Sequence, residues 1–256
     1  MNPASGPSYE ELVEAAVRAP ADGWDFGFLS GRVREGALPW SYEEMARAEI
    51  TAATRLLDLN TGGGETLLDV LQPQSVTLAA ATESWEPNVP VARAKLGHRG
   101  IDVRAHEPGQ RLPAADAEFD LVLNRHGACD LGEVRRVLAP RGVYLTQQVG
   151  RSNDLELNAA LGGPPPRYSE DAVLDRDVEL LRRHGFEILE SGEAHIEHGF
   201  GDIGTVVFHL TMVSWQVPGF AVDTYDRALR QLDAQIRRDG FFTVRHHRYF
   251  VKAVRD

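Results

Sequence analysis

From residue 55 onward, short apolar runs alternate with segments whose apolar residues have helical spacing. The apolar runs predict strands at 55–60, 76–82, 101–104, 119–124 and 143–149. The segments between them predict helices at 65–71, 89–96 and 132–138, each ended by Gly or Pro. Because strands that alternate with helices are typical of a parallel sheet, the pattern predicts an α/β core.

A proline-rich loop at 161–170 interrupts this alternation. Beyond it, the spacing of Leu174, Val178 and Leu181 predicts a helix that ends at His184, followed by a strand at 186–190. The segment 192–220 is an insertion, and the chain closes with a predicted helix at 224–238 and a predicted strand at 241–254. These two strands bring the predicted total to seven.

The first 50 residues form neither strands nor a free linker in this interpretation. Ser8 with Glu11, and Ser41 with Glu44, have capping-box spacing, so we expect helices to begin near residues 9 and 42. The segment between them is rich in aromatic residues among glycines and a proline, and we expect it to fold onto another part of the protein. Its aromatic residues are Trp24, Phe26, Phe28 and Trp40.

The stretch LLDLNTGGGE, residues 56–65, joins a buried strand to a helix through three glycines. Glycines can take positive φ and let a ligand approach the backbone, and the free N–H groups of the following helix turn face the same space. The spacing does not fit the dinucleotide fingerprint G-x-G-x-x-G, because Leu67 stands where the third glycine belongs. NAD and FAD are therefore disfavoured as ligands.

This stretch resembles the S-adenosylmethionine (SAM) loop of class I methyltransferases, an acidic residue followed by x-G-x-G-x-G. Asn60 replaces the first glycine, and Asn is the other residue that tolerates the left-handed region. The resemblance implies that the loop contacts SAM and its product S-adenosylhomocysteine. The expected contact residues are Asp58, Asn60, Thr61, Gly62 and Gly64.

Two further motifs follow in the order that this family has. Glu83 ends the second predicted strand, where the resemblance implies a carboxylate that binds the ribose hydroxyls. The segment 111–150, RLPAADAEFDLVLNRHG and EVRRVLAPRGVYLTQQVG, is similar to two later blocks of the family, with Arg141 in place of a glycine. The acidic residue that faces adenine is replaced by Pro108, and Glu107 beside it is the expected substitute.

The loop after the fourth strand carries the expected chemistry. His126 lies where the family contacts the methyl end of SAM, and we expect it to act as general base or substrate orienter. A structural role for His126 is equally open. Asn124 and Arg125 are expected cofactor contacts from the same loop. The expected acceptor-side and lid residues are Gln147, Gln148, Trp24, Trp40 and Tyr42.

Composition places limits on location and partners. The chain has 256 residues, 43% hydrophobic, with no secretory leader and no apolar run long enough to span a membrane. Together with a lone cysteine, Cys129, this predicts a cytoplasmic protein. The net charge of −11 argues against nucleic acid as the main partner, although residues 227–256 carry eight Lys/Arg against three Asp.

Histidines in the C-terminal half raise the question of a metal site. We expect none, because no cysteines accompany them and Glu197 would point to the other face of a strand. The histidines are His195, His198, His209, His246 and His247.

The sequence thus predicts a Rossmann-like, seven-stranded, mostly parallel sheet with helices on both faces, an antiparallel last strand and an N-terminal helical lid. The predicted parts are an N-terminal cap at 1–50, a SAM-binding core at 51–160 and a C-terminal completion of the sheet at 161–256. The predicted function is SAM-dependent methylation of an O, N or C nucleophile of a small molecule. A tRNA or rRNA methyltransferase and a non-catalytic SAM-binding module are the alternatives, and a homodimer is left open.

Overall fold

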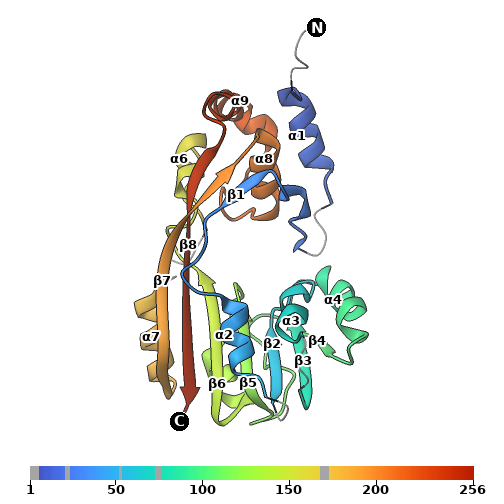
Figure 1. The fold of residues 1–256 in the computed structure, drawn as a ribbon, viewed down its shortest axis with the longest axis vertical. Helices are drawn as coiled ribbons and strands as arrows, with labels where there is room; N and C mark the ends of the chain where they lie inside the picture. Colours follow the sequence, from blue (N-terminus) through green and yellow to red (C-terminus); the bar gives the residue numbers. More distant parts are fainter. Residues whose placement is uncertain (1–5, 21–23, 52–53, 73–75, 168–172) are drawn as a thin grey trace. The chain divides into compact units, whose positions relative to one another are not determined.

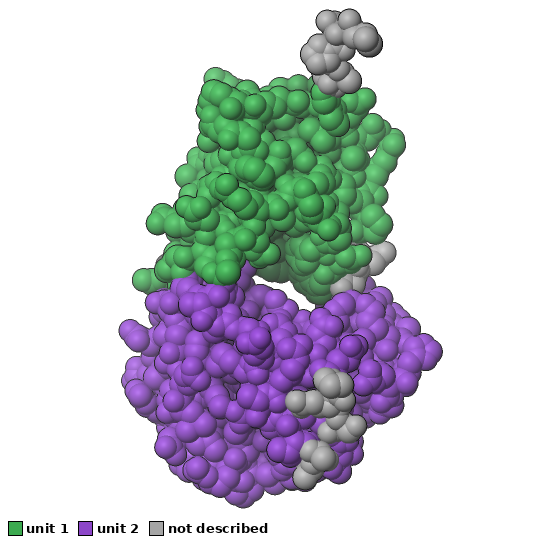
Figure 2. Space-filling model, viewed as in Figure 1, with its two compact units in different colours: residues 1–37, 151–170, 195–247 green, residues 38–150, 171–194, 248–256 purple. Residues whose placement is uncertain are grey.

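The computed structural model describes residues 6–20, 24–51, 54–72, 76–167 and 173–256. The chain divides into two compact units, coloured separately in Figure 2. Unit 1 is built from residues 1–37, 151–170 and 195–247, and unit 2 from residues 38–150, 171–194 and 248–256. Each unit therefore gathers three separate stretches of sequence.

The strands in the described part of the chain form one eight-stranded sheet in the order β1-β7-β8-β6-β5-β2-β3-β4 (Figure 1). The strands β2, β3, β4, β5 and β6 pair in parallel, and β8 pairs antiparallel with β6. In unit 2 these strands are β2 (Arg55–Leu59), β3 (Leu78–Glu83), β4 (Asp102–Ala105), β5 (Phe119–Arg125) and β6 (Leu138–Val149). The strands β7 (Phe186–Phe200) and β8 (Phe242–Arg255) contribute residues to both units.

Helices cover both faces of the sheet in unit 2, because successive strand residues point to opposite faces. Leu56 packs in a core cluster with residues of α2 (Tyr42–Ala48), α3 (Glu65–Val70) and α4 (Asn88–Gly97). Its neighbour Leu57 packs in a second cluster with residues of α5 (Leu131–Val137) and α7 (Leu174–Arg183). The apolar run of β2 is therefore that of a strand buried on both faces.

The strand order reverses direction at β2. From β2 the chain continues outward through β3 to β4, and then returns to β5 on the other side of β2. Open α/β sheets bind ligands at the carboxyl ends of the strands beside such a reversal. The glycine loop after β2 and the loop after β5 both begin at this position.

Unit 1 has its own apolar core around helix α8 (Ile203–Met212), in which nine residues are buried. Its other elements are α1 (Tyr9–Arg18), the 3-10 helix η2 (Gly27–Leu29), β1 (Val33–Glu35), α6 (Leu155–Leu161) and α9 (Val222–Asp239). Ser8 forms the predicted capping box with Glu11 at the start of α1. No helix among the described residues has both the length and the apolar character to cross a membrane.

The predicted α/β class, the mostly parallel sheet and the antiparallel last strand are confirmed, and three details differ. The eighth strand is β1, which pairs antiparallel with β7 through Val33 and Phe200 in a segment too interrupted by glycine to signal a strand. The strand predicted at 186–190 continues to Phe200, and helix α8 occupies the predicted insertion at 192–220. The predicted proline-rich loop lies partly outside the described residues. The compact units have boundaries other than those of the predicted segments 1–50, 51–160 and 161–256, and these segments stay a prediction about domains.

Candidate functional site

The glycine loop of unit 2 has the backbone conformation that its sequence predicts. Asn60 has φ 55°, Gly62 has φ 63° and Gly64 has φ 89°. At Gly64, a Cβ atom would lie 2.7 Å from the side chain of Leu96, which is fully buried. Only glycine fits this position without displacing the core.

Side-chain hydrogen bonds hold Asn60 in its left-handed conformation. Its Nδ2 donates to the carbonyl of Ala128 at 3.0 Å, and its Oδ1 accepts from Ser84 Oγ at 3.1 Å. The first contact joins the glycine loop to the loop after β5, and the second joins it to the end of β3. A glycine would allow the same turn but would make neither contact. Asn60 therefore makes the loop more rigid than a glycine would. Ser84 gave no signal in the sequence, because its role depends on the pairing of two strands.

Glu83 lies beneath the glycine loop and is 3% exposed. Its Oε2 accepts from the N–H of Gly62 at 2.6 Å, and its Oε1 accepts from the N–H groups of Ser84 and Trp85 at 2.8 and 2.7 Å. A carboxylate offers about four lone-pair directions, so three backbone bonds leave one acceptor direction, on Oε2. Glu83 therefore fixes the loop, and its predicted binding of ribose stays a prediction with room for one hydroxyl.

Asp58, at the end of β2, is 7% exposed. Burial raises its pKa to about 7, the nearby charge of Glu83 adds to that rise, and the Thr61 hydroxyl and Arg125 oppose it. Buried Tyr42 in α2 also has a raised pKa, through burial first and the charge of Asp58 second. The site thus has a carboxyl group that gains or loses its proton near neutral pH.

Asn124 at the end of β5 is fully buried beside the same loop. Its Oδ1 accepts from the N–H of Gly127 at 3.2 Å and from Gln148 Nε2 at 2.9 Å. Its Nδ2 has no hydrogen-bond partner among the described residues. Because a buried amide N–H without a partner costs about 1–3 kcal/mol, this nitrogen is a donor that a bound ligand or water could satisfy.

A chain of hydrogen bonds runs from Trp40 through Gln147 to His126. Trp40 Nε1 donates to Gln147 Oε1 at 2.8 Å, and Gln147 Nε2 lies 3.3 Å from His126 Nε2. Since the indole nitrogen can only donate, the Gln147 oxygen must face Trp40 and its NH₂ group must face His126. His126 Nε2 is then the acceptor, as in a neutral imidazole. His126 itself is exposed, with φ 63°.

The other predicted site residues have varied surroundings. Arg125 Nη1 donates to Thr66 Oγ1 at 2.8 Å and lies 3.7 Å from Glu43, so it ties the end of β5 to α3 and α2. Glu107 is exposed in the turn after β4 and accepts from Gln110 Nε2 at 2.7 Å. Trp24 belongs to unit 1, where it packs against Trp215 with ring centroids 5.5 Å apart. Hydrogen bonds thus join the glycine loop to Glu83 and to the loop after β5, no such contact is seen for Glu107 among the described residues, and Trp24 packs against the core of unit 1.

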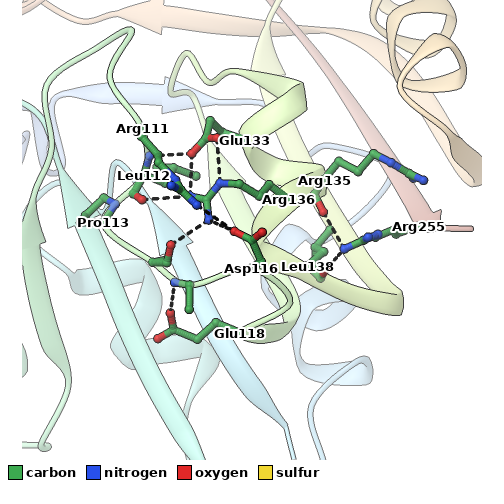
Figure 3. A network of polar contacts seen from close by, with 12 residues as sticks. Arg111, Leu112, Pro113, Asp116, Glu118, Glu133, Arg135, Arg136, Leu138 and Arg255 are labelled. Carbon is green, nitrogen blue, oxygen red and sulfur yellow. Dashed lines mark hydrogen bonds and ion pairs between the residues drawn. The ribbon is translucent and has the colours of Figure 1, made fainter.

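The family-like blocks at 111–150 meet in a polar network centred on Arg136 (Figure 3). Arg136 donates to the carbonyls of Leu112 and Ala114 at 3.0 and 2.8 Å, and forms ion pairs with Glu133 and Asp116. Glu133 also accepts from the N–H of Leu112 at 2.8 Å, and Arg136 holds the pKa of Glu133 below its usual value. This network fixes the approach to β5. The same blocks also carry five residues of the candidate site: Asn124, Arg125, His126, Gln147 and Gln148.

Comparisons with known proteins test the resemblance to class I methyltransferases. No family model matches the chain. It is 33% identical over 113 residues to the demethylmenaquinone methyltransferase of Thermus thermophilus, which covers 41% of this chain and 51% of that protein. The chain therefore spans about half the length of the curated relative that it matches.

Solved structures share the fold at low sequence identity. The [4+2]-cyclase SpnF has a TM-score of 0.58 and 16% identity, with 97% of this chain and 96% of that chain covered. An S-adenosylmethionine dependent methyltransferase from Mesorhizobium loti has a TM-score of 0.50 and 15% identity, with 86% and 100% covered. Together with the strand order and the glycine loop, these similarities show that the chain has the Rossmann-like fold of class I SAM-dependent methyltransferases.

Proposed function

We propose that this protein is a SAM-dependent methyltransferase that acts on a small molecule. The observation that carries the proposal is that Asp58, the left-handed glycine loop and Asn124, whose amide nitrogen has no partner among the described residues, lie together at the reversal of strand order. The glycine loop and Asp58 are as expected for a SAM site, and the curated relative is named a methyltransferase.

The residues of this sheet edge fit SAM by their chemistry. SAM carries a sulfonium and an amino group, both positive, and Asp58 would offer them a carboxyl group that ionises close to neutral pH. Glu83 Oε2 has one acceptor direction left for a ribose hydroxyl, and Asn124 Nδ2 has a donor to offer. When bound, SAM supplies an electrophilic methyl group. The chain's part is to align an acceptor with it, and such positioning contributes several kcal/mol.

His126 orients the acceptor in this proposal. Gln147 already engages His126 Nε2, at 3.3 Å, and Trp40 fixes the direction of that amide. To act as a general base through Nε2, His126 would have to give up its bond to Gln147. The hydrogen bonds from Trp40 through Gln147 therefore favour a role for His126 in orienting the acceptor over one in removing its proton. The expectation that Trp40 also covers the acceptor rests on its position at the other end of the same chain, where its ring lies 4.8 Å from that of Phe250.

The RNA alternative rested on the basic residues at 227–256, and their contacts do not favour it. At least five of the eight form ion pairs with carboxylates, which reduces the positive field that nucleic acid needs. These five are Arg230, Arg237, Arg238, Arg245 and Lys252.

Calorimetric titration of the full chain with S-adenosylhomocysteine tests the cofactor. We expect saturable binding, and Glu83→Ala should weaken it by roughly 1–3 kcal/mol because the loop N–H groups lose their acceptor. Glu86→Ala, which removes an exposed carboxylate three residues away, is the matched control and should bind like the wild type. Absence of binding at high micromolar ligand in a folded wild-type protein would contradict the proposal.

Methyl transfer needs a separate assay with labelled SAM. We propose to begin with demethylmenaquinone, because the curated relative is named for it, and to continue with a metabolite extract. Transfer to any small molecule supports the proposed reaction. Cofactor binding with no transfer to any component would instead favour the non-catalytic SAM-binding module, an alternative motivated by Asn60, Pro108 and Arg141.

A further inference from the structure

Three strands of unit 1 bring two histidines and a glutamate together. Among the described residues, Glu35, His198 and His246 form a group whose potential ligand atoms all lie within 4.8 Å of one another. Glu35 is on β1, His198 on β7 and His246 on β8, and Glu35 is paired directly with His198 in the register of β1 and β7. The imidazole rings of His198 and His246 stack with their centroids 4.2 Å apart.

A second set of residues lies behind His246. The Asp154 side chain is 1% exposed, and its Oδ1 lies 3.2 Å from His246 Nε2. Its Oδ2 lies 3.1 Å from His209 Nε2 and accepts from Asn153 Nδ2 at 2.7 Å. Asp154 takes a left-handed conformation, φ 55°, to reach this position. We call Glu35, His198, His246, Asp154 and His209 the histidine cluster.

We propose that the histidine cluster is a binding site for a divalent transition-metal ion such as Zn²⁺, with Glu35, His198 and His246 as its ligands. Two imidazoles and one carboxylate are a ligand set that Zn²⁺ accepts in proteins, with a fourth position left for water. Bond lengths of about 2.0–2.2 Å would place pairs of ligand atoms about 3.3 Å apart, so small side-chain rotations close the observed group.

The arrangement of Asp154 is the argument that separates this site from a chance grouping. Metal-bound histidines usually donate their other ring N–H to a carboxylate, which fixes the tautomer and the direction of the lone pair. His246 Nε2 lies 3.2 Å from Asp154 Oδ1, so a small rotation of the ring would form such a hydrogen bond and would leave Nδ1 as the nitrogen that binds the metal. The ring of Phe200, 4.7 Å from that of His198, closes one side with an apolar wall.

The burial of the three ligands differs in a way that suits such a site. His198 and His246 are buried, at 4% and 5% exposed, whereas Glu35 is exposed. An ion can therefore enter from the side of Glu35 and keep a water there. His195 and His247 stack on each other, 4.2 Å between centroids, and both lie within hydrogen-bond distance of Ser152 Oγ. They are a separate pair and not part of the proposed ligand set.

The test uses the untagged full chain, freed of metal by a chelator. We expect one Zn²⁺ to bind per chain in competition with a chromophoric chelator, and Zn²⁺ to raise the melting temperature. Co²⁺ in the same site should give the visible absorption of a low-coordinate ion. Glu35→Gln should weaken binding at least tenfold, and Asp154→Asn by about 10- to 100-fold, the usual effect of losing an outer partner.

Glu197→Gln is the matched control, because it removes the same charge from the exposed neighbour of His198. It should bind Zn²⁺ like the wild type. His198→Gln tests a buried ligand, and circular dichroism establishes whether it folds. If it does not, Glu35→Gln decides alone, since Glu35 is exposed. Absence of saturable binding in the wild type, or equal affinities of wild type and Glu35→Gln, would overturn the proposal.

Discussion

The glycine loop of unit 2 and the histidine cluster of unit 1 differ in how their residues come together. Residues 58–64 of the loop are consecutive, whereas the proposed metal ligands Glu35, His198 and His246 come from three distant strands. A local motif keeps its spacing whatever the rest of the chain does. A cluster built by strand pairing depends on register, and a shift of one residue would turn each side chain to the other face.

The largest expected effect concerns the histidine cluster. Asp154→Ala should lower the free energy of unfolding by about 3 kcal/mol, because His209 and Asn153 lose a buried acceptor and alanine tolerates the left-handed conformation poorly. Denaturant unfolding without added metal measures the change. Asp154→Asn keeps the backbone preference and one acceptor oxygen, and it should lose clearly less. A loss below about 1 kcal/mol for Asp154→Ala would mean that the cluster does not organise unit 1.

The next effect concerns the loop. Gly64→Ala should destabilise the protein by about 2 kcal/mol, through the left-handed backbone and the contact with Leu96. It should also weaken S-adenosylhomocysteine binding. The control is Gly97→Ala, one residue from Leu96, where a Cβ meets no atom within 4 Å. Equal stability of the two variants would contradict the conformation that we describe for the loop.

A smaller effect should appear as a pH dependence of SAM binding. The pKa of Asp58 is about 7, so the carboxyl group is increasingly protonated and neutral below that pH. A neutral group attracts the positive ligand less, and affinity should fall as pH drops from 8 to 6, by at most about tenfold per unit. S-adenosylhomocysteine, without the sulfonium charge, should respond less. Asp58→Asn should remove the dependence, and an unchanged profile in that variant would exclude Asp58 as its source.

The same raised pKa gives stability the opposite pH dependence: SAM affinity should rise with pH, whereas the contribution of Asp58 to stability should fall. The folded chain holds the Asp58 proton up to about pH 7, whereas the ordinary value is 3.8. The contribution of Asp58 to the free energy of unfolding therefore declines as pH rises between these two values. Asp58→Asn should reduce this decline, which unfolding measurements at pH 5 and pH 8 would detect.

The smallest effect concerns Arg141, which has φ 63° where the related motif has glycine. Arg141→Gly should raise the free energy of unfolding by about 0.5–1 kcal/mol, because glycine takes this conformation without strain. The ion pair that it loses, with Glu187 at 3.5 Å, is exposed and contributes little. Arg141→Ala keeps the strained conformation and should bring no gain. If Arg141→Ala also raised the free energy of unfolding, the stabilisation would come from removing the arginine side chain and not from relieving the backbone strain.

These two regions also show what the sequence could predict. Local patterns allow three features to be predicted: the strand at 55–60, the positive φ of Asn60 and the position of Glu83 at the end of a strand. The three backbone bonds of Glu83 could not be predicted, because they depend on how the ends of β2 and β3 meet. Our expectation of no metal weighed the histidines, the absence of cysteine partners and the direction of Glu197, but it did not consider Glu35. The glutamate that completes the group, Glu35, lies in a three-residue strand that no sequence pattern marks.

The division of each unit into three sequence stretches has a practical consequence for dissecting the protein. A fragment ending near residue 150 would contain the glycine loop but would lack β8, whose residues from Arg248 to Val254 pair with β6. Such a fragment would expose a long edge of β6 and would be prone to aggregate. The proposed cofactor site is local as a motif, yet the last residues of the chain pair with the sheet that carries it. Internal deletions or circular permutants, rather than truncations, are therefore the suitable tools.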